Sequence, residues 1–137
     1  MKDLMKKILF VCTGNSCRSQ MAEGIAKDLG WEAFSAGTKP EKKVNLIAIE
    51  VMAEINMDIS KHKPKLINEI KLNNMDIIMT VCSNADKNCP IFPDFSGKKM
   101  HHSFDDPAGI VGSKKEQLKV FRQIRDEIFD FIKSMNN

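Results

Sequence analysis

A small, polar segment constrains this chain more than any other feature: Cys-Thr-Gly-Asn-Ser-Cys-Arg-Ser at positions 12–19. Residues 7–11, with the run Ile-Leu-Phe-Val, are predicted to form a short buried strand directly before it. An amphipathic helix is predicted over residues 19–29. A loop between a strand and a helix can aim successive N–H groups inward, and the helix N-terminus adds its positive dipole end. The segment therefore predicts a binding site for a tetrahedral anion.

Two side chains give this loop its chemistry. Cys12 is expected at the bottom of the loop as a nucleophile, because the donors that hold an anion also stabilise a thiolate. The guanidinium of Arg18 can bind two oxygens of the anion at once. Gly14 is expected to allow the backbone conformation, and Ser19 to donate a hydrogen bond to the Cys12 sulfur. The predicted substrate-binding residues are Thr13, Gly14, Asn15, Ser16, Cys17, Arg18 and Ser19. The competing interpretation is a tight turn with buried cysteines.

Strands and helices alternate along the rest of the chain. Further strands are predicted over residues 32–36, 76–81 and 98–104, and further helices over residues 45–54, 65–72 and 114–135. This order predicts an α/β fold, a single three-layer domain over residues 1–137 whose four-stranded parallel sheet carries helices on both faces. Ligands bind beyond the carboxyl ends of such strands. Cys12, Cys82 and Asp106 all follow predicted strands, so we expect them on the same rim.

Composition excludes several classes of function. A formal net charge of +3, with lysines spread along the chain, does not indicate nucleic-acid binding. No stretch approaches the roughly 18 apolar residues of a membrane span, and no signal-peptide core is present. We therefore expect a cytoplasmic monomer. The four cysteines would be reduced there, which favours catalytic, redox or metal-binding roles.

A family resemblance follows from these motifs. Residues 11–23, together with Ser35-Ala36-Gly37, resemble the low-molecular-weight protein tyrosine phosphatase superfamily. Within it, residues 12–23 are more similar to the thioredoxin-coupled arsenate reductases, because the phosphatases usually have proline where this chain has Gln20. The resemblance implies a low-molecular-weight phosphatase-like fold, arsenate as substrate, thioredoxin as reductant and no cofactor.

Cys82 and Cys89 lie seven residues apart in a segment rich in Ser, Asn and Asp. In a helix their Cα atoms would be about 10 Å apart, too far for a disulfide, but this composition predicts a segment that opens easily. Both cysteines could instead be packing residues, or could bind zinc with His101 and His102. The resemblance implies a redox pair, which the tyrosine phosphatases lack.

An acidic loop follows the fourth predicted strand. A general acid must be protonated in the resting enzyme, and the resemblance assigns this role to Asp106, directly before a proline. Its neighbour Asp105 is expected to cap or orient the loop. Ala108 stands where the phosphatases commonly carry an aromatic residue, and the chain has no tyrosine. A pocket without aromatic walls favours a free inorganic anion over phosphotyrosine.

The resemblance implies a relay of three cysteines. In this relay Cys82 attacks Cys12, arsenite leaves, and a Cys12–Cys82 disulfide forms. Cys89 then attacks Cys82, and thioredoxin reduces the resulting Cys82–Cys89 disulfide. Ile91 and Phe92 are candidates for the thioredoxin docking surface. Cys17 has no place in the relay, so we expect a structural role, with a protective Cys12–Cys17 disulfide as the alternative.

Some of these reductases bind potassium through residues that resemble Asn15, Glu23 and Ser35, with further ligands from a stretch aligned with residues 62–65. Here that stretch contains Lys65, which would repel a cation. We therefore predict no metal site and expect Lys65 near Glu23. Two other functions stay open: a low-molecular-weight protein tyrosine phosphatase, and a redox sensor or metal-binding regulator without turnover.

Overall fold

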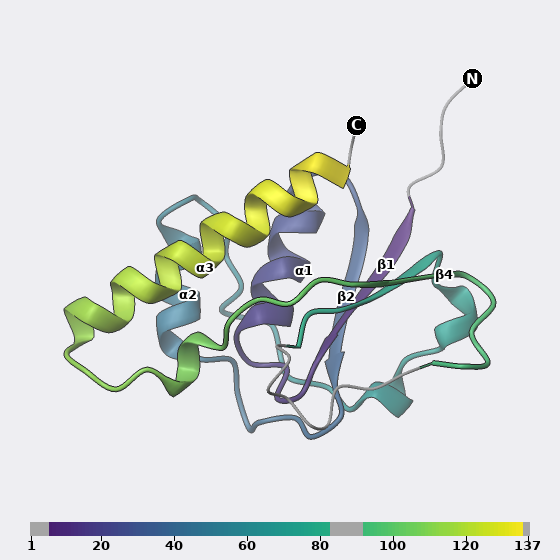
Figure 1. Cartoon of the computed structure of the whole chain (residues 1–137), viewed down its shortest axis with the longest axis horizontal. Helices are drawn as coiled ribbons and strands as arrows, with labels where there is room; N and C mark the ends of the chain where they lie inside the picture. The colour runs from purple at the N-terminus through teal and green to yellow at the C-terminus, as the bar shows by residue number, and fades with distance from the viewer. Residues whose placement is uncertain (1–5, 83–91, 136–137) are drawn as a thin grey trace.

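The computed structural model describes residues 6–82 and 92–135 (Figure 1). Its strands are β1 Lys7–Cys12, β2 Glu32–Gly37, β3 Ile77–Thr80 and β4 Lys98–His101. Its α-helices are α1 Arg18–Asp28, α2 Leu46–Ala53 and α3 Lys114–Met135. Three short 3-10 helices complete the described fold: η1 Ile67–Glu69, η2 Leu72–Asn74 and η3 Pro107–Gly109.

The sheet is parallel throughout and has the order β2-β1-β3-β4. Strand β1 lies between two partners: Val11 is paired with Thr80 of β3, and Cys12 with Gly37 of β2. Because parallel strands end on the same edge, the residues that follow β1, β2 and β3 meet there. The predicted α/β fold is confirmed, and this edge is where the predicted site must form.

Both faces of the sheet are covered by helices. Alternate residues of β1 point to opposite faces, and all of Ile8 to Cys12 are buried. Ile8 and Phe10 belong to a large core beneath α1, α2 and α3, which gather on one side of the sheet (Figure 1). Leu9 and Val11 belong to a smaller core, against which residues of η1 and η2 pack.

The α-helix predicted over residues 65–72 is wrong. The structure has η1 and η2 instead, because the backbone before them is committed to other partners. The Lys65 carbonyl accepts a hydrogen bond from the Gly37 N–H (2.8 Å), and the Lys65 N–H donates to Asn15 Oδ1 (2.9 Å). Leu66 forms a parallel bridge with Gly37, which keeps this stretch extended.

Strand β4 ends at His101, earlier than the predicted residue 104. The next residue, His102, stacks its ring on Phe131 of α3 at a centroid distance of 4.0 Å. Within the described residues, no helix is both long enough and apolar enough to cross a membrane.

An ion-pair cluster joins α2 to α3 at the end of α2. Glu54 accepts two hydrogen bonds from Arg122 Nε and one from Nη2, the shortest at 2.7 Å. Arg125 Nη1 donates to Glu54 Oε1 and to the Val51 carbonyl, both at 2.8 Å. Hydrogen bonding by Arg122 is the main reason that the pKa of Glu54 falls from 4.5 to about 2.

This cluster predicts a specific acid sensitivity. A carboxylate whose pKa is lower in the folded state stabilises the fold above its unfolded pKa, and that contribution disappears as pH falls through the folded pKa. We expect the contribution of Glu54 to be complete above about pH 4.5 and to be lost toward pH 2. Urea unfolding of wild type and Glu54→Gln, measured between pH 2 and 7, should show a smaller loss of stability with acid in the variant. Parallel curves for the two proteins would contradict this assignment.

Candidate active site

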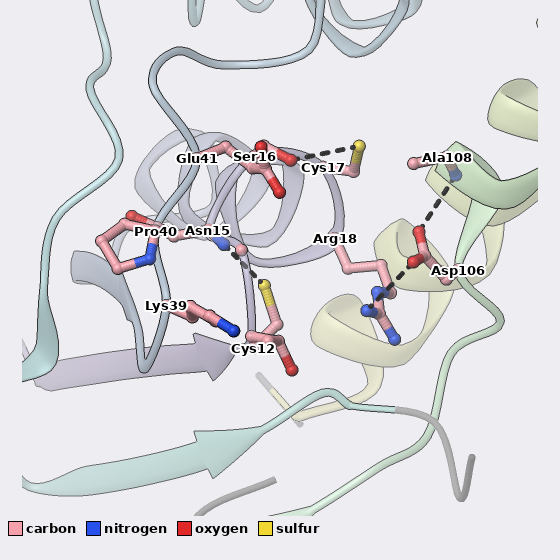
Figure 2. A pocket seen from close by; sticks show the side chains of 12 residues that line it. Cys12, Asn15, Ser16, Cys17, Arg18, Lys39, Pro40, Glu41, Asp106 and Ala108 are labelled. Atoms are coloured by element: carbon pink, nitrogen blue, oxygen red, sulfur yellow. Dashed lines mark hydrogen bonds and ion pairs between the residues drawn. The ribbon is translucent and has the colours of Figure 1, made fainter. Parts of the chain in front are cut away.

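A pocket of about 470 Å³ opens at the carboxyl end of β1 (Figure 2). It contains the predicted loop from Cys12 to Arg18, together with Asp106 and Ala108. The loop and the acidic turn are far apart in the sequence, and the parallel sheet brings them to one edge as predicted. Three further residues line the pocket that the sequence analysis did not single out: Lys39, Pro40 and Glu41.

The Cys12 sulfur lies among hydrogen-bond donors at the base of this pocket. The Asn15 N–H donates to Cys12 Sγ at 3.3 Å, and Ser19 Oγ lies 2.9 Å from the same sulfur. Ser19 Oγ also accepts a hydrogen bond from Asn15 Nδ2 at 2.8 Å, so its own proton is directed to the sulfur. Two donors on one sulfur stabilise the thiolate, as the sequence predicted for Ser19.

The loop takes its shape from Asn15, and the role expected of Gly14 is wrong. Asn15 has φ +50°, in the left-handed region, whereas Gly14 does not have a positive φ. Asparagine tolerates this region better than most residues. A side chain at Gly14 would instead meet the Glu41 side chain, whose Cγ lies 3.1 Å from the position of an added Cβ. At Gly14 the absence of a side chain therefore makes room for Glu41 and does not serve a left-handed backbone.

Gln20 fixes the conformation of Asn15 from inside the fold. It is completely buried, and its Nε2 donates to the Asn15 carbonyl (3.1 Å), Asn15 Oδ1 (3.2 Å) and the Lys63 carbonyl (3.2 Å). His62 Nδ1 lies 3.0 Å from Gln20 Oε1, so the ring must carry its proton on Nδ1. Burial lowers the pKa of His62, which favours this neutral form.

The end of β2 supports the loop from the other side. A Cβ added to Gly37 would lie 2.4 Å from the Thr13 carbonyl oxygen and 3.1 Å from Asn15 Cβ. Only a residue without a side chain allows β2 and the loop to come this close. This contact explains why Ser35-Ala36-Gly37 accompanies the loop motif in the sequence.

Arg18 lies on the opposite side of the pocket from Lys39 (Figure 2). It is the first residue of α1 and only 4% exposed; its Nη1 donates to the Phe104 carbonyl at 3.2 Å. Its Nη2 is 3.7 Å from Asp106 Oδ2. Asp106 Oδ1 accepts from the Ala108 N–H at 3.0 Å, which caps η3. The structure thus places the predicted anion-binding cation and the predicted acid within reach of one ligand.

Cys17 is chemically different from Cys12 although both belong to the loop. Burial raises the pKa of Cys17 from 9.0 to about 12, so it is a protonated thiol near neutral pH. The Ser16 hydroxyl lies 3.7 Å from its sulfur. Cys12 and Cys17 are both free thiols, and the structural role expected of Cys17 agrees with its burial.

Cys82 lies just beyond β3, the strand that pairs with β1. It is fully buried, and its sulfur is 3.8 Å from the Val11 carbonyl. Cys89 and Ile91 lie outside the described residues. His101 Nδ1 is 2.6 Å from Thr80 Oγ1, and His102 stacks on Phe131. Among the described residues there is no group of three or more His, Cys, Asp or Glu side chains that could hold a metal ion.

Two of the residues that resemble a potassium site, Glu23 and Ser35, are in direct contact. Ser35 Oγ donates to Glu23 Oε1 at 2.5 Å, and Glu23 is buried. The cation in contact with Glu23 is Lys27, with Nζ 2.6 Å from Oε2, rather than the expected Lys65. The Lys65 ammonium donates to the Lys63 carbonyl at 2.9 Å.

Comparison with known proteins agrees with this geometry. Residues 7–137 match the family model described as low molecular weight phosphotyrosine protein phosphatase. An arsenate reductase of Staphylococcus aureus strain N315 is 49% identical over 126 residues, covering 90% of each chain. Arsenate reductase 2 of Staphylococcus epidermidis strain RP62A is 48% identical over 132 residues, covering 94% of this chain and 95% of that one.

Solved structures give the same result. An arsenate reductase in a phosphate-binding state superposes with a TM-score of 0.81 at 31% identity and covers 96% of both chains. A low-molecular-weight protein tyrosine phosphatase from T. tengcongensis superposes with a TM-score of 0.75 at 30% identity, covering 95% of this chain and 97% of its own.

The contact between Gly37 and the loop can be tested with a matched pair of alanine substitutions. Gly37→Ala should destabilise the protein by about 2 kcal/mol, because overpacking forces the backbone apart, and should slow alkylation of Cys12 by disturbing its donors. Gly109→Ala is the control, since an added Cβ there meets nothing within 4 Å. Urea unfolding and the rate of iodoacetate labelling measure the two effects. Equal behaviour of the two variants would show that the close approach is unimportant.

Proposed function

This chain belongs to the low-molecular-weight phosphotyrosine protein phosphatase family, and we propose that within it the chain is a thioredoxin-coupled arsenate reductase. The similarity to arsenate reductases over nine-tenths of the chain supports the activity. The observation that carries the proposal is the second thiol: Cys82 follows the strand next to β1, at the same edge as Cys12. Hydrolysis of a phosphate ester needs Cys12, Arg18 and Asp106 but has no use for that thiol.

The pocket favours a free anion over a phosphotyrosine side chain. Of the described residues that line it, none is aromatic, and Ala108 occupies the wall beside Asp106. An aromatic ring bound there would lack stacking partners. Arsenate needs only hydrogen-bond donors and positive charge, which the loop and Arg18 provide.

In the first step, arsenate binds with its oxygens toward the loop and Arg18. The Cys12 thiolate attacks arsenic, a sulfur–arsenic bond forms, and one oxygen leaves as water after Asp106 supplies a proton. Arsenic is still in its +5 state at this point. Asp106 is suited to this role because its carboxyl lines the same pocket as the Cys12 sulfur.

In the second step, the Cys82 thiolate attacks the Cys12 sulfur. The sulfur–arsenic bond breaks and leaves its electron pair on arsenic, so arsenate is reduced to arsenite while a Cys12–Cys82 disulfide forms. Cys82 is fully buried, so its thiol must become accessible before this attack. Cys89 then attacks Cys82, which releases Cys12 and leaves a Cys82–Cys89 disulfide.

Thioredoxin supplies the two electrons that close the cycle, by thiol–disulfide exchange with Cys82–Cys89. Phe92, half-buried beside the apolar residues of the smaller core, is a candidate for its docking surface. The relay requires a compartment in which thiols are kept reduced, and the cytoplasm meets that requirement. We propose that the protein acts in the cytoplasm as a single-domain monomer.

The relay predicts a sharp effect of Cys89→Ser. Arsenate-dependent NADPH oxidation, coupled through thioredoxin and thioredoxin reductase, should run continuously in wild type and stop after about one cycle in the variant, because the Cys12–Cys82 disulfide is not passed on. Cys17→Ser is the matched control and should keep turning over, since Cys17 is a buried protonated thiol. Hydrolysis of a phosphotyrosine peptide without any arsenate turnover, unaffected by Cys89→Ser, would make the protein a phosphatase.

Two neighbouring aspartates separate the general acid from a loop residue. Asp106→Asn should lower kcat by about 10²–10⁴, the usual contribution of a positioned acid. Asp105→Asn should have little effect, because Asp105 does not line the pocket. Steady-state rates of arsenate turnover, measured side by side for wild type and both variants, should show this loss only in Asp106→Asn. Equal losses in both variants would assign these residues to loop structure alone.

A further inference from the structure

We propose that Lys39 is a second cationic binding residue of the anion pocket, acting on the oxyanion from the side opposite Arg18. In naming arsenate as the ligand this inference rests on the proposed function; the presence of the cation in the pocket does not. Lys39 lies two residues beyond the end of β2, where the parallel sheet brings residues to the same rim as Cys12.

The backbone of Lys39 is tied to the anion loop. Its N–H donates to the Thr13 carbonyl at 2.9 Å, and the Glu41 N–H donates to the Gly14 carbonyl, also at 2.9 Å. These two hydrogen bonds align residues 39–41 along the loop, so the Lys39 backbone has a fixed position. Only the flexible methylene stem has to be ordered when an anion binds.

The side chain of Lys39 points into the pocket. Figure 2 shows its ε-amine directed toward Cys12, with the Arg18 guanidinium on the other side of that cysteine. Lys39 is exposed, whereas Arg18 is buried and already in contact with Asp106 and the Phe104 carbonyl. The two cations therefore have different positions. Arg18 is held in place in the wall of the pocket, and Lys39 lies at the opening where an anion enters.

The negative charges in the site favour a second cation at the position of Lys39. Arsenate carries at least one negative charge at neutral pH, and it must approach the sulfur of Cys12, which attacks as a thiolate. Glu41 adds a carboxylate to the lining of the pocket, close to Gly14. One guanidinium does not balance these charges, and a positive side chain at the opening raises the local concentration of an incoming anion.

The first test measures the potential at Cys12 without using arsenate. Iodoacetate is an anion and iodoacetamide is neutral, so the ratio of their alkylation rates at Cys12, located by peptide mass mapping, reports the local positive charge. Lys39→Gln should lower the iodoacetate rate about fivefold, the upper size of one solvated charge contact, and leave the iodoacetamide rate unchanged. The concentration of inorganic phosphate that protects Cys12 by half should rise by a similar factor.

Three further variants separate charge from structure. Lys39→Arg should retain the wild-type ratio, and Glu41→Gln should shift it in the opposite direction from Lys39→Gln. Lys43→Gln is the matched control, because Lys43 is an exposed lysine four residues away that lines a neighbouring groove rather than this pocket. In the arsenate assay Lys39→Gln should raise KM about fivefold with little change in kcat, as expected when binding is lost uniformly.

An unchanged ratio in Lys39→Gln, or an equal fall with Lys43→Gln, would overturn the inference. A fall in both alkylation rates would also overturn it, because that result would indicate a disturbed loop. If wild type shows the expected alkylation ratios but no arsenate turnover, the proposed function fails while the role of Lys39 stands. If arsenate turns over normally and the ratios do not respond, Lys39 fails while the proposed function stands.

Discussion

The left-handed backbone at Asn15 is the constraint on which the site depends. A non-glycine residue held at φ +50° needs support from its surroundings. Gln20 supplies part of that support from α1, and the Lys65 N–H supplies the rest from the stretch before η1. In this conformation the Asn15 N–H points at the Cys12 sulfur while its side chain holds Ser19. One residue therefore orients both donors of the nucleophile.

The site also requires that segments far apart in the sequence come together, and the sheet provides this. Strand β1 lies between β2 and β3, so the segments that follow all three strands come together. The close packing of Gly37 on the Thr13 carbonyl holds the loop against β2, and the next residues of that segment are hydrogen-bonded to the loop. On the other side, Cys82 follows β3. The central position of β1 thus gives the loop its support from one neighbour and a second thiol from the other.

Sequence patterns predicted the fold class, the loop residues, and the position of Cys12, Cys82 and Asp106 beyond strands on one rim, because each depends on local periodicity or on the parallel topology. The helix expected over residues 65–72 failed since its backbone bonds to Asn15 and Gly37, which lie far away in sequence. Gly14 was given the role of Asn15 because glycine is the usual residue at positive φ. Lys39 and Glu41 were missed although they follow β2, and the rule that placed Cys82 on the rim could have found them.

The protonated state of Cys17 has a consequence for the fidelity of the chemistry. Burial raises the pKa of this thiol to about 12, so it is protonated at pH 7. Disulfide scrambling requires a thiolate as the attacking group, so Cys17 is kinetically silent even though it lies in the same loop as the nucleophile. Burial of Cys17 thus prevents thiol exchange between two sulfurs that are only five residues apart in the chain. Disulfide exchange is therefore confined to the cysteines of the relay, although Cys17 is present in the loop.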